Sequence, residues 1–435
     1  MSGLSQCMIV KNEEANIERA LSWGVGLVDE QIVVDTGSTD RTVEIARSMG
    51  AKVFRYTWDD DFAGAKNYAV SQASGKWIAF LDADEYFEPG DAKKIPELLK
   101  ELSPEQVDGL MVSMIQLDGE GGFFAGGSQA RIFANREDIC YRRRIHEQLI
   151  RKDGKPLHLR DSTKELCVIH TGYRKDEKLQ ALKGQRNLRM ILWELEDNPK
   201  DYEMLGYLGD IYFSAEQLDK AQEAYQKAVR YMPPQTVPGD QRSAMTFLNL
   251  ISIADHKNEG EERMKEILSA AFAREELRKD ADFDYLAARW YLSRGQFQEA
   301  LPFLIGTIDK IEKYGNFNRA LYAAAHVQEI FEQTALCCLK EGKLQEAVSQ
   351  AAAVLQEDPW SFAALTVLAE SFYKGNVEAG QAEEFLSRFY DRSSLKSRIF
   401  LLRAAGKAGW KELEERFRRH LSAEELACFD RSVLQ

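Results

Sequence analysis

Several features that define common protein classes are missing from this 435-residue sequence. Its six cysteines form no Cys-x-x-Cys pair, which excludes zinc-ribbon and thioredoxin-type sites. No run of about 18 apolar residues occurs, so no membrane-spanning helix is predicted. There is no Gly-x-Gly-x-x-Gly motif after the first expected strand and no P-loop motif. Dinucleotide dehydrogenases and P-loop nucleotidases are therefore disfavoured.

Positive charge is outnumbered, with 57 Lys and Arg against 70 Asp and Glu. The net charge of −13 argues against a general nucleic-acid binder. The first residues lack the basic and long apolar regions of a secretory leader. Most cysteines lie in apolar contexts, as free thiols do in a reducing compartment. We therefore expect a cytoplasmic protein, and its length suggests two or three domains.

The first part of the chain alternates short strand-like and helix-like stretches. The strand-like runs cover residues 4–10, 31–35, 51–56 and 77–81. This pattern predicts an α/β domain with a mostly parallel sheet covered by helices on both faces. Ligands in such sheets bind beyond the carboxyl ends of the strands. Three polar loops fall there, at residues 11–14, 35–40 and 82–85.

The last of these loops crowds three carboxylates, Asp82, Asp84 and Glu85, into four positions. Like charges this close repel, so such a cluster needs a positive partner. A hard divalent cation that also binds phosphate oxygens is a natural candidate. The alternatives are a metal–nucleotide site and a solvated acidic turn.

Four motifs then identify a family. They are Met8–Glu14, Val33–Thr42, Asp61–Asn67 and Leu81–Glu85, in this order. With them, residues 4–175 resemble a family 2 glycosyltransferase of the Rossmann-like GT-A fold. Two positions depart from the usual family pattern. Many members carry an acidic residue in place of Thr36, and Arg is commoner than Lys at position 66.

The resemblance implies a nucleotide-sugar donor, UDP-linked, and Mn²⁺ or Mg²⁺ as the metal. The donor-binding residues it implies are Val10, Glu14, Asp35, Lys66, Asn67 and Asp82. It also implies that Asp84 binds the metal and that His170, late in the domain, completes the metal shell. For Asn67 the alternative is a structural hydrogen bond at the start of its helix.

An inverting transferase needs a carboxylate that acts as general base on the acceptor. The base must lie opposite the leaving group and not on the metal, and Glu147 is the best candidate outside the acidic cluster. The alternative is an ordinary Glu at a strand end. His146 either orients Glu147 or contacts the diphosphate.

Two further segments each allow two interpretations. The Gly119–Gly127 segment is either a mobile lid or a long hairpin. The basic stretch between residues 142 and 160 either holds a diphosphate or an acidic acceptor, or forms a solvated strand edge.

Beyond residue 176 strand-like runs vanish, and small and aromatic residues recur in the tetratricopeptide pattern. We expect a glycosyltransferase domain at 1–175, a linking helix at 176–198, tetratricopeptide-like repeats at 199–390 and a helical cap at 391–435. The repeats form a solenoid that offers a concave surface to peptides or to a second copy, as in a homodimer.

The layout resembles bacteriocin-peptide S-glycosyltransferases of the sublancin type. It implies a metal-dependent inverting enzyme that moves a hexose or N-acetylhexosamine to Cys, Ser or Thr of a peptide or protein. One alternative is a transferase that acts on a cell-surface glycan or a lipid-linked intermediate. The other is a non-catalytic repeat scaffold with a decayed transferase domain.

Overall fold

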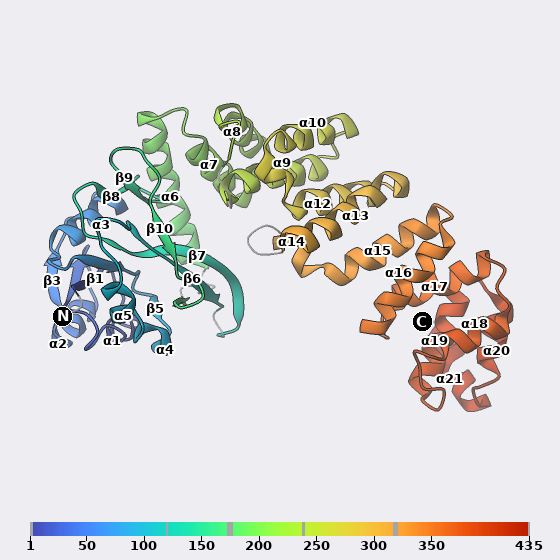
Figure 1. Ribbon diagram of the computed structural model, residues 1–435. Coiled ribbons are helices and arrows are strands. Elements are labelled where there is room, and N and C mark those ends of the chain that lie inside the picture. The colour runs from blue at the N-terminus through green and yellow to red at the C-terminus, as the bar shows by residue number, and fades with distance from the viewer. Residues whose placement is uncertain (1–2, 119–120, 172–176, 237–239, 316–320, 434–435) are drawn as a thin grey trace. The chain divides into compact units, whose positions relative to one another are not determined.

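The computed structural model describes residues 3–118, 121–171, 177–236, 240–315 and 321–433 (Figure 1). The chain divides into two compact units, Met1–Ala215 and Glu216–Gln435. The first unit thus includes two helices beyond residue 175, where the sequence placed the end of the catalytic domain. Within the described ranges, no helix is both long enough and apolar enough to cross a membrane.

A large sheet forms the centre of the first unit. Its strand order is β3-β2-β1-β4-β7-β6-β11-β5, β10 pairs with β6, and β8 and β9 form a separate ribbon. The strands are β1 Leu4–Val10, β2 Glu30–Asp35, β3 Lys52–Arg55, β4 Trp77–Phe80, β5 Glu85–Phe87, β6 Gly109–Leu117, β7 Phe123–Ala134, β8 Ile139–Arg142, β9 Gln148–Arg151, β10 Leu159–Asp161 and β11 Cys167–His170.

Short helices connect the strands, and two longer helices follow them. They are α1 Ile17–Ser22, α2 Thr42–Ser48, α3 Phe62–Ser71, α4 Pro89–Ala92, α5 Ile95–Lys100, α6 Glu177–Asp197 and α7 Tyr202–Ser214. Helices α4 and α5 are separate, because Pro96 lies in the first turn of α5 and has no N–H with which to continue α4.

The parallel half of the sheet confirms the α/β prediction and sets the position of the site. Strands β3, β2, β1 and β4 run parallel, and Val10 at the end of β1 lies in register with Asp35 at the end of β2. Strand β4 is buried along its whole length. The carboxyl ends of β1, β2 and β4 therefore meet at one edge, which is where the polar loops were expected. Beyond β4 the sheet is mixed, since β7 runs antiparallel to both β4 and β6.

The second unit consists of helices throughout its described residues. They are α8 Leu218–Tyr231, α9 Gln241–His256, α10 Glu261–Phe272, α11 Glu275–Arg278, α12 Ala281–Leu292, α13 Phe297–Tyr314, α14 Leu321–Ala325, α15 Val327–Lys340, α16 Leu344–Glu357, α17 Phe362–Lys374, α18 Ala379–Leu386, α19 Leu395–Lys407, α20 Lys411–Arg418 and α21 Ala423–Val433. Neighbouring helices pack in pairs, among them α9 with α10, α12 with α13 and α15 with α16. The predicted helical-repeat fold is confirmed.

A left-handed residue marks the turn inside successive helix pairs. Gly295, Gly342 and Gly409 have φ near +70°, and Asn258 and Asn376 have φ of 51° and 53° at the corresponding turns. Glycine and asparagine tolerate this conformation better than other residues. The glycines at 295 and 342 were visible as repeat signals in the sequence. Asparagine takes the place of glycine in the pairs α9/α10 and α17/α18.

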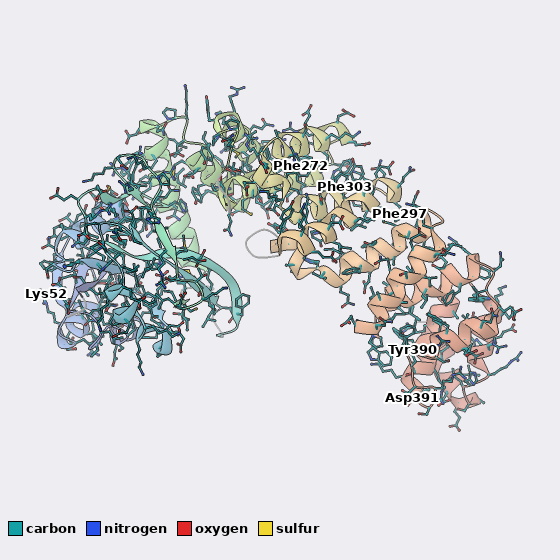
Figure 2. The ribbon with its side chains drawn as sticks, viewed as in Figure 1. Lys52, Phe272, Phe297, Phe303, Tyr390 and Asp391 are labelled. Carbon is teal, nitrogen blue, oxygen red and sulfur yellow. The ribbon has the colours of Figure 1, made fainter. Side chains whose placement is uncertain are left out.

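Aromatic rings fill the interior around α12. Phe272 of α10 makes an edge-to-face contact with Phe283, and Phe303 of α13 stacks on Tyr291, with ring centroids 5.9 and 5.6 Å apart (Figure 2 labels Phe272 and Phe303). Phe283 and Tyr291 both lie on α12. Rings of this size supply much of the buried apolar area that holds one helix pair to the next.

The amino-terminal ends of the parallel strands are tied together by Glu30. Its carboxylate accepts hydrogen bonds from Ser5 on β1 and from Ser74, and lies 2.6 Å from Nζ of Lys52 on β3, which Figure 2 labels. Burial alone would raise the pKa of Glu30. The bonds from Lys52, Ser74 and Ser5 instead lower it from 4.5 to about 2. Ionised Glu30 therefore stabilises the folded state.

We expect Glu30→Gln to lower the free energy of unfolding at pH 7 by about 1–3 kcal/mol. A lowered pKa contributes stability that is present above pH 4.5 and is lost as pH falls toward 2. The gap between wild type and variant should therefore narrow over that window in urea titrations. Glu44→Gln, at an exposed pair with Arg41, is the control and should leave stability unchanged. A gap that does not change with pH would contradict the assignment.

Candidate active site

A buried lysine lies at the centre of the site. We use the term rim for the sheet edge where the carboxyl ends of β1, β2 and β4 meet, together with the loops that follow these strands. Lys66, on α3, is 3% exposed, and its Nζ is 2.6 Å from Oε1 of Glu147 and 3.3 Å from Oδ1 of Asp82. The rings of Phe80 and Tyr141 lie beside the ammonium, 5.1 and 5.4 Å away. Burial lowers the pKa of Lys66, but the two carboxylates more than offset this and hold it above its ordinary value. The lysine is a fixed cation that joins the two carboxylates.

Arg131 of β7 supplies a second buried cation. It pairs with Glu85, which is 3% exposed, and its NH2 lies 3.8 Å from Oδ2 of Asp82. Glu85 also accepts a hydrogen bond from the main-chain N–H of Asp82 at 3.1 Å. Burial raises the pKa of Glu85, whereas Lys66 and Arg131 outweigh burial at Asp82 and lower its pKa. Glu85 therefore shapes the turn, and Asp82, with a side chain 42% exposed, faces the rim.

Asp84 and His170 meet next to this network. Nε2 of His170, at the end of β11, lies 3.3 Å from Oδ2 of Asp84. The main-chain N–H and the hydroxyl of Thr171 both donate to the carbonyl of Asp84, at 3.0 and 3.1 Å, and fix the turn. The hydrogen bond with Asp84 raises the pKa of His170 above its ordinary value, against the effect of burial. The two predicted metal ligands are thus brought together from positions 86 residues apart.

The chemistry of this pair fits a divalent cation that shares its ligands with a substrate. A carboxylate and an imidazole are suitable ligands for Mn²⁺, and a carboxylate suits Mg²⁺. Among the described residues, no group of three or more His, Cys, Asp and Glu side chains could enclose a metal ion.

The loops after β1 and β2 are bound to each other. The side chain of Asn12, in the left-handed conformation, accepts from Thr39, and Glu14 accepts from the main-chain N–H of Arg41 at 3.0 Å. Asp35, 5% exposed, accepts from the N–H of Ser38 at 2.9 Å. Of the predicted donor residues, Asp35 and Glu14 thus lie in one loop pair, in which Glu14 holds the loop before α2.

Two other predicted donor residues have structural partners. The amide of Asn67 donates to the carbonyl of Tyr141 at 2.9 Å and accepts from its N–H at 2.8 Å. Asn67 therefore joins α3 to β8, and the donor contact implied by the resemblance stays a prediction. Val10 is buried, and its carbonyl accepts from the N–H and hydroxyl of Thr36. Only its main chain borders the rim.

The basic stretch between 142 and 160 is largely satisfied by internal ion pairs. Arg143 pairs with Asp201, Arg151 with Asp153 and Arg160 with Glu165. These pairs account for much of the local positive charge without a ligand. The glycine-rich segment lies at the tip of the hairpin formed by β6 and β7, and residues 119–120 lie outside the described ranges.

Sequence reasoning missed Arg131 and the contacts that the helices beyond residue 175 make with the turn before Glu147. Arg131 stands within the apolar run Ala130–Phe133, where a charged residue signals a buried partner. The contribution of α6 and α7 had no local signal, because it depends on contacts between residues about 50 to 60 positions apart.

Comparisons with known proteins agree with this geometry. Residues 5–174 match the sequence profile of the family described as glycosyl transferase family 2. The chain is 32% identical over 242 residues to a TPR repeat-containing protein of Synechococcus elongatus, covering 54% of this chain and 58% of that protein. It is 45% identical over 85 residues to an uncharacterized glycosyltransferase of Rickettsia typhi, covering 20% of this chain and 29% of that protein.

A third relative is the SPbeta prophage-derived glycosyltransferase SunS of Bacillus subtilis. It is 27% identical over 225 residues, which cover half of each chain. This chain therefore matches between 29% and 58% of the length of these relatives. The α/β part is a family 2 glycosyltransferase domain, and the predicted combination with tetratricopeptide-like repeats is confirmed.

We expect Glu85→Gln to lower the free energy of unfolding by about 3 kcal/mol, because it leaves the buried Arg131 cation without its nearest carboxylate. Urea unfolding followed by tryptophan fluorescence measures this. Glu97→Gln, whose carboxylate is 75% exposed and pairs with Lys100, is the control and should have little effect. Equal stability of the two variants would show that the Arg131–Glu85 pair contributes nothing.

Proposed function

We propose that this family 2 glycosyltransferase domain transfers a hexose or N-acetylhexosamine from a UDP-sugar, with inversion, to a Cys, Ser or Thr side chain of a peptide or protein. The observation that carries the proposal is the fixed arrangement of carboxylates around Lys66. Asp82 lies on one side of the buried ammonium and Glu147 on the other. A donor-side carboxylate and an acceptor-side carboxylate are thus held in constant relation to each other.

The donor end of the site comprises Asp35, Asp82 and the pair Asp84–His170. Asp35 and the loop that Glu14 supports bind the nucleoside, and the exposed edge of Asp82 faces the sugar nucleotide. Asp84 and His170 would hold a divalent cation, Mn²⁺ or Mg²⁺, which when bound supplies Lewis-acid stabilisation of the leaving diphosphate.

The acceptor end depends on Glu147. Its side chain is 17% exposed, so the carboxylate is mostly shielded from water and still open on one side. It accepts the proton of the acceptor hydroxyl or thiol as the oxygen or sulfur attacks the anomeric carbon. Lys66 fixes the direction of the carboxylate, since one of its oxygens is bound to the ammonium. Inversion follows when attack comes from the face opposite the leaving group.

A peptide or protein acceptor is favoured by the combination of domains. SunS, a glycosyltransferase, is similar over half of this chain, and the helical repeats provide an extended surface of paired helices. Stacked helical repeats suit extended chains better than small soluble acceptors. The repeats are also the place where a homodimer would form.

Asp84→Asn should lower donor hydrolysis and transfer by at least about 100-fold, because it removes one of two protein ligands to the cation. The assay is release of UDP from UDP-glucose and UDP-N-acetylglucosamine with Mn²⁺ or Mg²⁺. Asp161→Asn, exposed and outside the rim, is the matched control. Full metal-dependent activity of Asp84→Asn would overturn the metal assignment.

Glu147→Gln should leave UDP binding intact and slow transfer by about 10²- to 10⁴-fold, the usual contribution of a general base. Calorimetric titration with UDP measures binding, and mass spectrometry of Cys-, Ser- and Thr-containing peptides measures transfer. Lost UDP binding would show that Glu147 is not the base. Transfer to glycans or lipid-linked sugars but to no peptide would reject the proposed acceptor.

A further inference from the structure

The turn that carries Glu147 has a strained backbone. Arg143 and His146 both adopt the left-handed conformation, with φ of 80° and 52°. Side chains with a Cβ rarely adopt this conformation, and each instance costs on the order of 1 kcal/mol unless surrounding contacts enforce it. Glu147 directly follows the second of these residues, so its direction depends on whatever holds the turn.

Arg143 is held by the start of α7. Its guanidinium pairs with Asp201 at 2.9 Å and with Glu203, and all three side chains are less than one fifth exposed. Asp201 is also the N-cap of α7, where it accepts from the main-chain N–H groups of Glu203 and Met204. Asp201 therefore both caps the helix and binds the turn, and Glu203, in the first turn of the helix, binds it as well. Gln148, just beyond Glu147, also donates to Glu203 at 3.1 Å.

The next three residues of the turn are held by α6 and α7 as well. The main-chain N–H of Arg144 donates to Glu194 of α6 at 2.6 Å. Ile145 is 4% exposed and belongs to the apolar cluster that contains Met190 of α6 and Met204 of α7. The ring of His146 lies on that of Tyr207 of α7, with centroids 3.5 Å apart and planes 7° from parallel.

Every residue from 143 to 146 thus has a partner on α6 or α7, and the first residue after them, Glu147, has its partner on α3. We propose that α6 and α7 position the catalytic carboxylate, and that Arg143 and Tyr207 are positioning residues for Glu147. This inference rests on the proposed function only for the role of Glu147 as base. The two helices then belong to the active site through the turn that they hold.

The physical reason is the precision that a general base requires. A displacement of about 1 Å at a reacting group costs on the order of 100-fold in rate. Loss of the Arg143 or Tyr207 contact frees a backbone that is unfavourable by itself, so the turn relaxes and Glu147 moves away from the acceptor. The contacts that hold this turn come from α6 and α7, whereas the turn of Asp84 is held by Thr171. We therefore expect donor binding to stay unchanged.

The test compares truncations with conservative changes in the full chain. Arg143→Ala and Tyr207→Ala remove the contacts. Arg143→Lys keeps the charge, and Tyr207→Phe keeps the ring. Arg263→Ala is the control, because Arg263 of α10 pairs with Glu266 of the same helix at 2.9 Å, in the second unit. The readouts are kcat for transfer, the Kd for UDP, and hydrogen–deuterium exchange of peptides covering residues 140–150.

The alanine variants at 143 and 207 should lower kcat by about 10- to 100-fold at an unchanged Kd for UDP. They should also speed exchange in the 140–150 segment. The Lys and Phe variants should recover most of kcat, and the control should match wild type. Wild-type kcat and exchange in both alanine variants, or a loss of UDP binding that parallels kcat, would overturn the inference. If the alanine variants speed exchange in the 140–150 segment but the wild-type protein shows no transferase activity, the positioning role is upheld and the proposed function is rejected.

Discussion

The arrangement of the first unit depends on one buried cation. Lys66 is enclosed by the rings of Phe80 and Tyr141, and a charge in such surroundings is tolerated only when opposite charge accompanies it. Asp82, directly after β4, and Glu147, in the turn after β8, supply that charge. Three segments that are distant in sequence are therefore bound to one ammonium, and the two carboxylates cannot move independently. A flexible surface lysine would bring no such constraint.

The same principle explains how three carboxylates can lie within four positions. Each has its own cationic or polar partner: Lys66 for Asp82, His170 for Asp84 and Arg131 for Glu85. These partners come from α3, β11 and β7, so three separate elements neutralise the carboxylates that follow β4. The alternative of a solvated acidic turn does not fit Glu85, which is buried.

How far the sequence could predict this site depends on the range of the contacts. Strand ends, the order of the polar loops and the pairing of Asp84 with His170 followed from local patterns and from the family resemblance. The two hydrogen bonds between the side-chain amide of Asn67 and the main chain of Tyr141 could not be predicted in this way. An Asn near a helix start has the same local signal whether it binds a ligand or a strand. The sequence does not predict the role of Glu85, because its partner, Arg131, is 46 residues away. The sequence does not indicate the repeat turns at Asn258 and Asn376, because asparagine is less distinctive of a left-handed turn than glycine.

The division of the chain after Ala215 has an evolutionary consequence. Helix α7 has the place of the first repeat helix in sequence, yet its contacts belong to the unit that contains the sheet. A recombination event that exchanged the repeats at residue 175 or 199 would remove part of the support of the turn before Glu147. Only junctions beyond α7 would leave that support whole. The repeats can therefore diversify in length and surface while their first helix is inherited with the α/β domain. The repeat array is thus less interchangeable than its repetitive sequence implies.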